Sequence, residues 1–350
     1  MRYKLLGRSG LRVSELCLGT MGFGDGVSWG SSKEESRRIF HAFADAGGNF
    51  IDTANTYTEG LSEIYLGELL APRRHSFVLA TKYSLSVDAS EVNSCGNHRK
   101  NMIQSLEASL KRLKTDYVDL YWVHAWDFMT SVEEVMRALD DLVRAGKVLY
   151  AGISDTPAWI VSQANTLAAL RGWTPFVGLQ VRYSLIDRAA ERDLLPMAQA
   201  FDITVTTWGA LGGGLLSGKY LNNQTPNEPK RLADSDPGLN ERNLKISEEV
   251  NRVAGRIDKT PSQVSLNWVR RSGARTIPII AGRNVAQIKD NLACVDFTLE
   301  EEFVRTLNEA SRIDLGFPHD LLAADRFKKR LFGETLPLID AGDIKGSPWL

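Results

Sequence analysis

The sequence has few of the features that mark a secreted or nucleic-acid-binding protein. Its 350 residues include only three cysteines, Cys17, Cys95 and Cys294, which lie far apart. The odd count argues against a disulfide framework, and the wide spacing argues against a cysteine metal site. Lysine and arginine number 42 against 43 acidic residues, so the net charge of -1 favours neither nucleic acid nor an anionic membrane.

Long hydrophobic runs and targeting segments are also missing. No stretch of 18 residues is free of charged side chains, and the N-terminal sequence MRYKLLGRSG contains no long apolar segment. We therefore expect a cytoplasmic protein in a reducing compartment, with no metal site and no membrane or nucleic-acid partner. Cys17 and Cys294 lie in apolar runs and are expected in the core, while Cys95 is expected to be more exposed. The oligomeric state is left open by the sequence.

The chain lacks the G-x-G-x-x-G turn that begins a Rossmann dinucleotide-binding fold. The glycine-rich sequence GGGLLSG at 212–218 is not that motif, because no βαβ unit with a downstream acidic residue surrounds it. Its backbone N–H groups are still able to line a pyrophosphate. A dinucleotide site in this protein would therefore be built on another fold.

What the sequence does contain is a repeated alternation of short apolar runs and amphipathic segments. Apolar runs predict strands at SELCLGT (14–20), NFID (49–52) and near residues 77, 118, 148, 177, 203 and 275. Helices are predicted at 31–47, 61–70, 97–113, 131–146, 157–172, 190–201 and 260–273. This alternation predicts an α/β fold, the TIM (β/α)8 barrel, in which the loops after the strands meet at one mouth.

Segments outside the alternation complete the predicted organisation. Residues 1–16 read as a β-hairpin before the first barrel strand. The long stretch 209–243 is rich in glycine, proline and asparagine and is expected to be an active-site loop that folds over a cofactor. One domain is expected over 1–350, with a C-terminal extension from about 312, because barrels of this length commonly form a single unit.

Four titratable residues, Asp52, Tyr57, Lys82 and His124, stand at or just after the ends of successive predicted strands. An unperturbed tyrosine loses its proton near pH ~10, and an adjacent ammonium stabilises the phenolate and lowers that pKa. We therefore expect Lys82 to lower the pKa of Tyr57, Asp52 to hold Lys82, and His124 to orient a carbonyl oxygen. The alternative for each residue singly is a structural role as a cap or a salt bridge.

The four residues together, in the order D-x-x-x-x-Y, K and H, resemble the catalytic tetrad of the aldo-keto reductases. The resemblance covers nearly the whole chain and includes DTANTYTEGLSEIYLG (52–67), DLYWVHAWD (119–127), GKVLYAGISD (146–155), GLQVRYSLIDR (178–188) and IPIIAGRNVAQIKDN (277–291). It implies reversible reduction of aldehydes or ketones to alcohols by hydride transfer, with Tyr57 as the proton donor. In this family an N-terminal hairpin closes the bottom of the barrel.

The resemblance also implies a site for NADPH. Arg283 stands at a helix start, where a phosphate is favoured, and Gln287 and Asn291 lie on one face of that helix, where they can contact adenine. The alternative is that these side chains cap the helix or face solvent, but in the family the matching positions bind the adenosine 2′-phosphate and adenine. Further cofactor contacts are expected from Gly209, Leu211, Gly214, Lys219 and Gly282.

At the nicotinamide end, Ser154, Asp155 and Gln180 fit hydrogen bonds to the carboxamide, and Trp208 fits a stacking platform. Relatives usually have asparagine at the position of Asp155, and many have tyrosine at that of Trp208. An ionised aspartate only accepts hydrogen bonds, so it would accept from the carboxamide NH2 group. Asp155 alternatively serves as a helix N-cap, and Gln180 as a polar partner inside the barrel.

Trp29 and Trp126 follow predicted strands and are expected to wall an apolar substrate pocket, although both could instead pack one loop on another. Two other functions stay open. A Schiff-base aldolase would use Lys82 as the nucleophile. A sensor or partner-binding protein would hold NADPH with little turnover.

Overall fold

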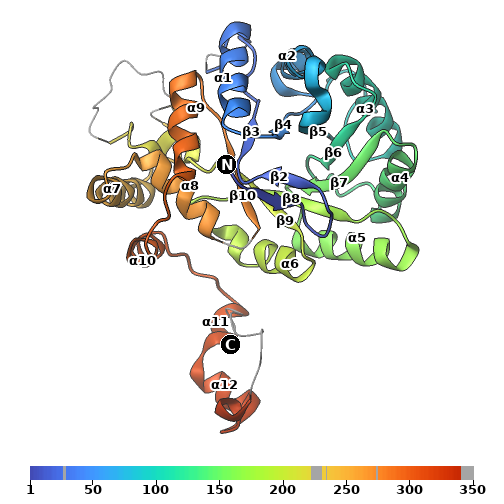
Figure 1. The fold of residues 1–350 in the computed structure, drawn as a ribbon. Helices are drawn as coiled ribbons and strands as arrows, with labels where there is room; N and C mark the ends of the chain where they lie inside the picture. The colour runs from blue at the N-terminus through green and yellow to red at the C-terminus, as the bar shows by residue number, and fades with distance from the viewer. Residues whose placement is uncertain (27–28, 222–230, 234, 273–274, 340–350) are drawn as a thin grey trace.

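The computed structural model describes residues 1–26, 29–221, 231–233, 235–272 and 275–339. Parallel strands form a closed barrel in the order β10-β3-β4-β5-β6-β7-β8-β9, with helices around it (Figure 1). The strands are β3 (Cys17–Gly19), β4 (Phe50–Asp52), β5 (Val78–Tyr83), β6 (Val118–Val123), β7 (Val148–Ser154), β8 (Phe176–Arg182), β9 (Thr204–Trp208) and β10 (Thr276–Ile280). The predicted TIM (β/α)8 barrel is confirmed.

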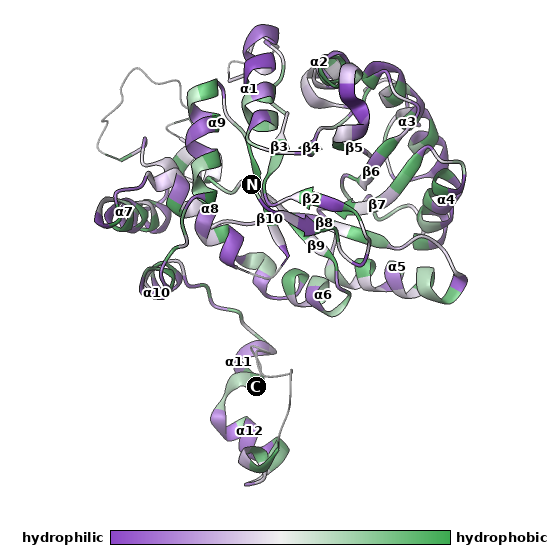
Figure 2. Ribbon diagram, in the orientation of Figure 1, coloured by the Kyte–Doolittle hydropathy of each residue, from purple (hydrophilic) through white to green (hydrophobic). Residues whose placement is uncertain are grey.

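The outer helices carry both hydrophilic and hydrophobic stretches, as Figure 2 shows. They are α1 (Lys33–Asp45), α2 (Leu61–Leu70), α3 (Arg99–Leu113), α4 (Val132–Arg144), α5 (Ala158–Arg171), α6 (Leu194–Ala200), α7 (Glu241–Arg256), α8 (Pro261–Arg271), α9 (Val285–Leu292) and α10 (Glu301–Ala310). In α4, the Ser131 side chain caps the first turn, and Val135, Leu139 and Leu142 are buried on one face. This pattern packs the helix on the barrel.

The predicted helix 190–201 is shorter than expected. A 3-10 turn, η3 (Ala189–Glu191), precedes α6, which begins only at Leu194. Pro196 explains the break, because proline has no N–H and is tolerated only within the first turn of a helix. The proline therefore requires α6 to start close to it.

The N-terminal hairpin, β1 (Tyr3–Leu5) and β2 (Arg12–Ser14), is antiparallel as predicted. The Gly7 N–H donates to Thr204 Oγ1 at 2.7 Å, and Arg275 donates to the Gly7 carbonyl at 2.6 Å. Thr204 begins β9 and Arg275 precedes β10, so the hairpin lies at the amino ends of the strands. It therefore covers the bottom of the barrel and leaves the other end for the site.

The long loop after β9 contains a 3-10 segment, η4 (Gly212–Ser217), before α7. Part of the predicted active-site loop, residues 222–230 and 234, lies outside the described residues. At the other end of the chain, α11 (His319–Ala323) and α12 (Asp325–Phe332) lie away from the barrel (Figure 1). Within the described ranges, no helix is long and apolar enough to span a membrane, and no group of three potential metal-ligating side chains occurs.

Cys17 and Cys294 are buried as predicted, and Cys95 is partly exposed.

Candidate active site

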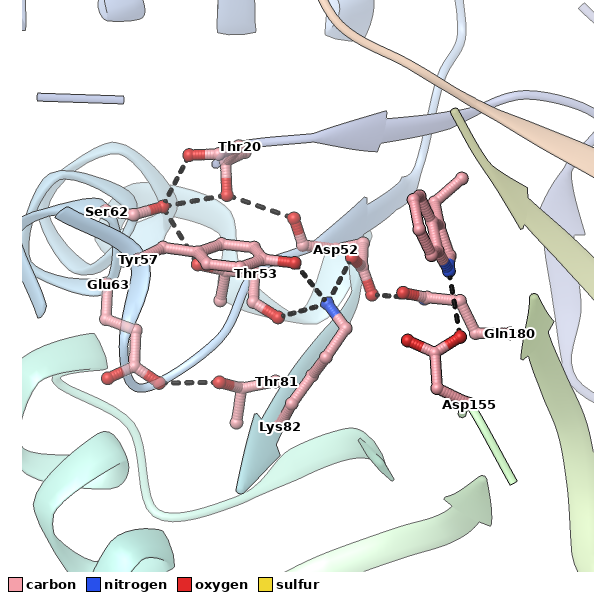
Figure 3. A network of polar contacts seen from close by, with 11 residues as sticks. Thr20, Asp52, Thr53, Tyr57, Ser62, Glu63, Thr81, Lys82, Asp155 and Gln180 are labelled. Carbon is pink, nitrogen blue, oxygen red and sulfur yellow. Dashed lines mark hydrogen bonds and ion pairs between the residues drawn. The ribbon is translucent and has the colours of Figure 1, made fainter. Parts of the chain in front are cut away.

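The carboxyl ends of neighbouring strands bring the four predicted catalytic residues together, and Figure 3 shows Asp52, Tyr57 and Lys82 of this group. Asp52 ends β4, Lys82 lies in β5 and His124 directly follows β6. Tyr57 begins η1 (Tyr57–Gly60), the turn that connects β4 to α2. Because β4, β5 and β6 are parallel neighbours in the barrel, their polar terminal residues face one mouth.

The Lys82 ammonium is at the centre of this group and is fully buried. It donates to Asp52 Oδ2 at 2.5 Å, to the Thr53 carbonyl at 2.8 Å and to Tyr57 Oη at 3.1 Å. An ammonium has three N–H groups, so these three acceptors account for all of them. Burial alone would lower the pKa of Lys82, but the charge of Asp52 and the Tyr57 side chain raise it, which keeps the group cationic.

Gln180 is a neighbour of Asp52 that the sequence alone did not reveal. Its Nε2 donates to Asp52 Oδ1 at 3.0 Å. The alternative role of Gln180, as a polar partner inside the barrel, is therefore confirmed. A carboxylate only accepts, so the amide nitrogen of Gln180 is the donor to Asp52, and the second N–H and the carbonyl oxygen of Gln180 are the groups able to contact a ligand.

The predicted direction of the Tyr57 pKa shift is wrong. Burial raises the pKa of Tyr57, and the Lys82 ammonium opposes this rise without reversing it. The sequence shows that an ammonium is close but not how far the phenol is removed from water. Tyr57 is therefore a protonated phenol at neutral pH, in the form that donates a proton.

The His124 ring lies edge-on to the Tyr57 ring, with centroids 6.1 Å apart. Burial and the nearby Lys82 ammonium lower the pKa of His124 to about 3. Its Nδ1 is buried with no hydrogen-bond partner among the described residues. The imidazole is thus neutral at physiological pH and able to donate one hydrogen bond to a ligand.

The predicted nicotinamide-binding residues lie beside this group. Ser154 ends β7, and its Oγ is buried without a hydrogen-bond partner in the described structure. Trp208 Nε1 donates to Asp155 Oδ1 at 3.1 Å. Asp155 does not cap α5, because Pro157 occupies the N-cap position and that helix start has no side-chain cap, so the capping alternative for Asp155 is wrong.

A groove of about 590 Å³ extends from the mouth to the start of α9. Its walls come from the loops after β3 and β9, the end of β10 and the first turns of α8 and α9. The groove brings together the following predicted cofactor residues: Gly209, Leu211, Gly214, Lys219, Gly282, Arg283, Gln287 and Asn291. Lys219 and Arg283, beside glycine-rich backbone, suit an anionic ligand.

Local hydrogen bonds shape the α9 end of the groove. Asn284 Oδ1 caps α9 by accepting from the Gln287 N–H, and Gln287 Oε1 accepts from the Arg283 N–H. Asn291 is buried and donates from Nδ2 to the Ala281 carbonyl at 2.9 Å. One N–H of Asn291 is therefore used by the backbone, and its second N–H and its amide oxygen are the groups able to contact a ligand.

The two predicted substrate-pocket tryptophans have different surroundings. Trp29 lines the groove, and the Arg231 guanidinium lies 4.7 Å from its ring centroid. Trp126 is partly buried and packs against the hydrophobic core, outside the lining of that groove. Arg231 also lines the groove, and sequence reasoning missed it because a single arginine in a polar loop carries no motif.

Comparison with known proteins agrees with this geometry. The model of the aldo/keto reductase family matches residues 15–312. The chain belongs to the aldo-keto reductase family. Norsolorinic acid reductase of Aspergillus flavus is 39% identical over 324 residues, covering 90% of this chain and 82% of that protein. An aryl-alcohol dehydrogenase of Pestalotiopsis microspora is 38% identical over 333 residues, covering 92% and 85%.

An aldo-keto reductase of Emericella nidulans is 36% identical over 347 residues, covering 93% of this chain and 85% of its own. This membership confirms the sequence resemblance. This aldo-keto reductase is therefore an oxidoreductase of a family that acts on small carbonyl compounds.

Proposed function

We propose that this aldo-keto reductase reduces aldehydes or ketones to alcohols with NADPH, reversibly, with Tyr57 as the proton donor. The observation that carries the proposal is the Lys82 ammonium, which donates to Asp52 and Tyr57 at once. The Ser154 hydroxyl, buried without a hydrogen-bond partner in the described structure, fits a contact to the nicotinamide. The groove lined by Lys219 and Arg283 fits the phosphates of a dinucleotide. The bound cofactor supplies the hydride.

The chain's own residues handle the proton. As the carbonyl oxygen gains negative charge, Tyr57 donates its proton from Oη to that oxygen. The phenolate that remains is stabilised by Lys82, whose N–H already points at Oη, and Asp52 balances the lysine charge. Neutral His124 donates a hydrogen bond to the substrate oxygen and so orients it beside Tyr57.

The Schiff-base alternative is disfavoured by the state of Lys82. A nucleophilic lysine must be an unprotonated amine with a lowered pKa. The pKa of Lys82 is instead raised, and its three hydrogen bonds leave no N–H for a substrate. Lys82 is therefore an electrostatic partner of Tyr57.

We further propose aryl carbonyls as substrates and NADPH as the cofactor. Similarity to an aryl-alcohol dehydrogenase and the aromatic Trp29 beside the mouth support an aryl group. Arg283 at the start of α9 supports recognition of the additional 2′-phosphate of NADPH. Among carbonyl compounds, a reactive benzaldehyde is therefore the first substrate to assay.

The test of this function is oxidation of NADPH or NADH by the purified protein with such an aldehyde. We expect turnover with NADPH, and we expect Arg283→Gln to raise the Kd of NADPH about 30-fold through loss of a charge-assisted bond. The Kd of NADH should change less than about twofold, since NADH lacks the phosphate. Lys289→Gln, an exposed lysine of α9 outside the groove, is the matched control.

Equal weakening of both cofactors by Arg283→Gln would contradict the phosphate contact. NADPH binding without turnover of any aldehyde or ketone tested would favour the sensor or partner-binding alternative.

The pH dependence of the two directions follows from the pKa values of the site. The pKa of Tyr57 is raised and that of His124 is about 3, so neither group changes its protonation state near neutral pH. We expect kcat/KM for reduction to lack a step near the ordinary histidine pKa of about 6.5. Alcohol oxidation needs the phenolate and should accelerate as pH rises. A pH-rate profile of both reaction directions measures this. A step near neutrality would contradict the expectation, and its persistence in His124→Gln would show that a group other than His124 titrates there.

A further inference from the structure

Three buried hydroxyl groups lie directly behind the catalytic residues, outside the cofactor groove. Thr20 follows β3, Thr53 follows β4 and Ser62 lies in the first turn of α2; all three are fully buried. Ser62 Oγ lies 2.8 Å from Thr53 Oγ1, from the Thr20 carbonyl and from Thr20 Oγ1 (Figure 3). We call this group the hydroxyl clasp.

Each hydroxyl of the clasp has one proton to donate, and this determines the direction of the hydrogen bonds within the clasp. Thr20 Oγ1 donates its proton to the Asp52 carbonyl at 3.0 Å, because a carbonyl oxygen only accepts. Ser62 has one proton, and the adjacent Thr20 carbonyl requires it to point toward Thr20. Thr53 must then donate to Ser62, since two oxygens at 2.8 Å with no proton between them would repel. The clasp therefore runs from Thr53 through Ser62 to Thr20 and Asp52.

The clasp closes the turn that carries Tyr57. Thr53 and Ser62 stand at the two ends of this turn, and their side chains are bonded to each other. Within it, Thr58 and Glu59 have φ values of 47° and 57°, a left-handed conformation that is unfavourable for residues with a side chain. Such a turn persists only where its surroundings hold it, and the Thr53–Ser62 bond is one of those restraints.

The same clasp holds the acceptors of Lys82. Thr20 fixes the Asp52 backbone, and Ser62 fixes Thr53, whose carbonyl accepts from Lys82 at 2.8 Å. With two N–H groups of Lys82 directed to Asp52 and Thr53, the third is directed to Tyr57 Oη. The clasp thus contacts the supports of both Lys82 and Tyr57 without touching the ligand groove.

We propose that the hydroxyl clasp, with Ser62 at its centre, positions Lys82 and Tyr57 so that the Lys82 ammonium stays hydrogen-bonded to Tyr57 Oη during proton transfer. The inference rests on the proposed reductase function. It assigns Thr20, Thr53 and Ser62 to catalysis as positioning residues, which act through the lysine and the phenol and do not contact the substrate.

The test compares Thr53→Val, which keeps the shape but loses the hydroxyl, with Thr53→Ser, which keeps the hydroxyl and loses a methyl. We expect Thr53→Val to lower kcat about tenfold or more relative to Thr53→Ser, because small displacements of reacting groups slow catalysis strongly. The Kd of NADP+ should stay unchanged. The pH at which alcohol oxidation accelerates should rise by about half a unit, since a loosened Lys82 stabilises the phenolate less.

Ser62→Ala provides a second variant if Thr53→Val folds poorly, because it removes the central hydroxyl and leaves Thr53 intact. Equal kcat and equal pH profiles for Thr53→Val and Thr53→Ser overturn the proposal. Loss of folding in both hydroxyl-deleted variants, or loss of NADP+ binding in parallel with turnover, also overturns it in favour of a purely structural role. Absence of NADPH-dependent turnover of any aldehyde or ketone by the wild type refutes the proposed function itself, so the two failures are distinct.

Discussion

Tyr57→Phe is expected to lower kcat for carbonyl reduction about a thousandfold, which corresponds to roughly 4 kcal/mol of transition-state stabilisation. Phenylalanine keeps the ring that lies edge-on to His124 but has no proton to donate. The Lys82 N–H that now points at Tyr57 Oη would lose its acceptor, while its bonds to Asp52 and Thr53 remain. Steady-state reduction of a benzaldehyde with NADPH measures the effect.

A matched control for this variant is Tyr65→Phe, which removes a phenol from the outer helix α2. We expect it to leave kcat within about twofold of the wild type, because phenylalanine keeps the half-buried ring that packs on the core and Tyr65 lies away from the site. The Kd of NADPH should be the same in both variants, since neither phenol lines the groove. Wild-type turnover in Tyr57→Phe would remove Tyr57 from the mechanism.

The second large effect is expected from Lys82→Met, which leaves the Asp52 carboxylate buried without its counter-ion. Lys82 and Asp52 are 0% and 2% exposed, so solvent cannot replace the lost partner. Breaking a buried pair of this kind typically destabilises a protein by about 3 to 5 kcal/mol. We therefore expect a lower free energy of unfolding in urea, and a loss of turnover of about a hundredfold or more.

The double variant Asp52→Asn/Lys82→Met separates these two consequences. It removes both charges, so we expect it to recover most of the lost stability but none of the turnover. Lys245→Met, which breaks an exposed pair with Glu241 on α7, is the control and should leave the free energy of unfolding nearly unchanged, because water screens an exposed pair. Recovery of turnover in the double variant would show that the ion pair serves only the fold.

Much of the architecture was predictable from the sequence, because barrel strands and helices have strong local signatures. Strands buried on both faces read as apolar runs, and helices show caps and a periodic apolar face. The capping box at Thr260 and Gln263 is one such signal, and α8 begins where it predicts. Polar residues at the ends of parallel strands share a mouth, which is why Asp52, Lys82 and His124 could be grouped in advance.

The less accurate predictions concern properties that depend on the surroundings of a residue. The net pKa shift of Tyr57 depends on how completely the folded chain removes the phenol from water, and this outweighs the Lys82 charge. The partner of Gln180 lies 128 residues away in the sequence, and no local pattern connects it to Asp52. The same holds for Arg231, whose contact with Trp29 joins two loops.

The sequence by itself therefore determined the barrel, the family and the identity of the candidate catalytic residues, since these follow from periodicity, strand ends and motif order. Only the tertiary structure decided the protonation state of Tyr57, the three acceptors of Lys82 and the hydroxyl clasp formed by Thr20, Thr53 and Ser62. Burial and hydrogen-bond direction are set by atoms from separate strands, and those atoms become neighbours only when the barrel closes.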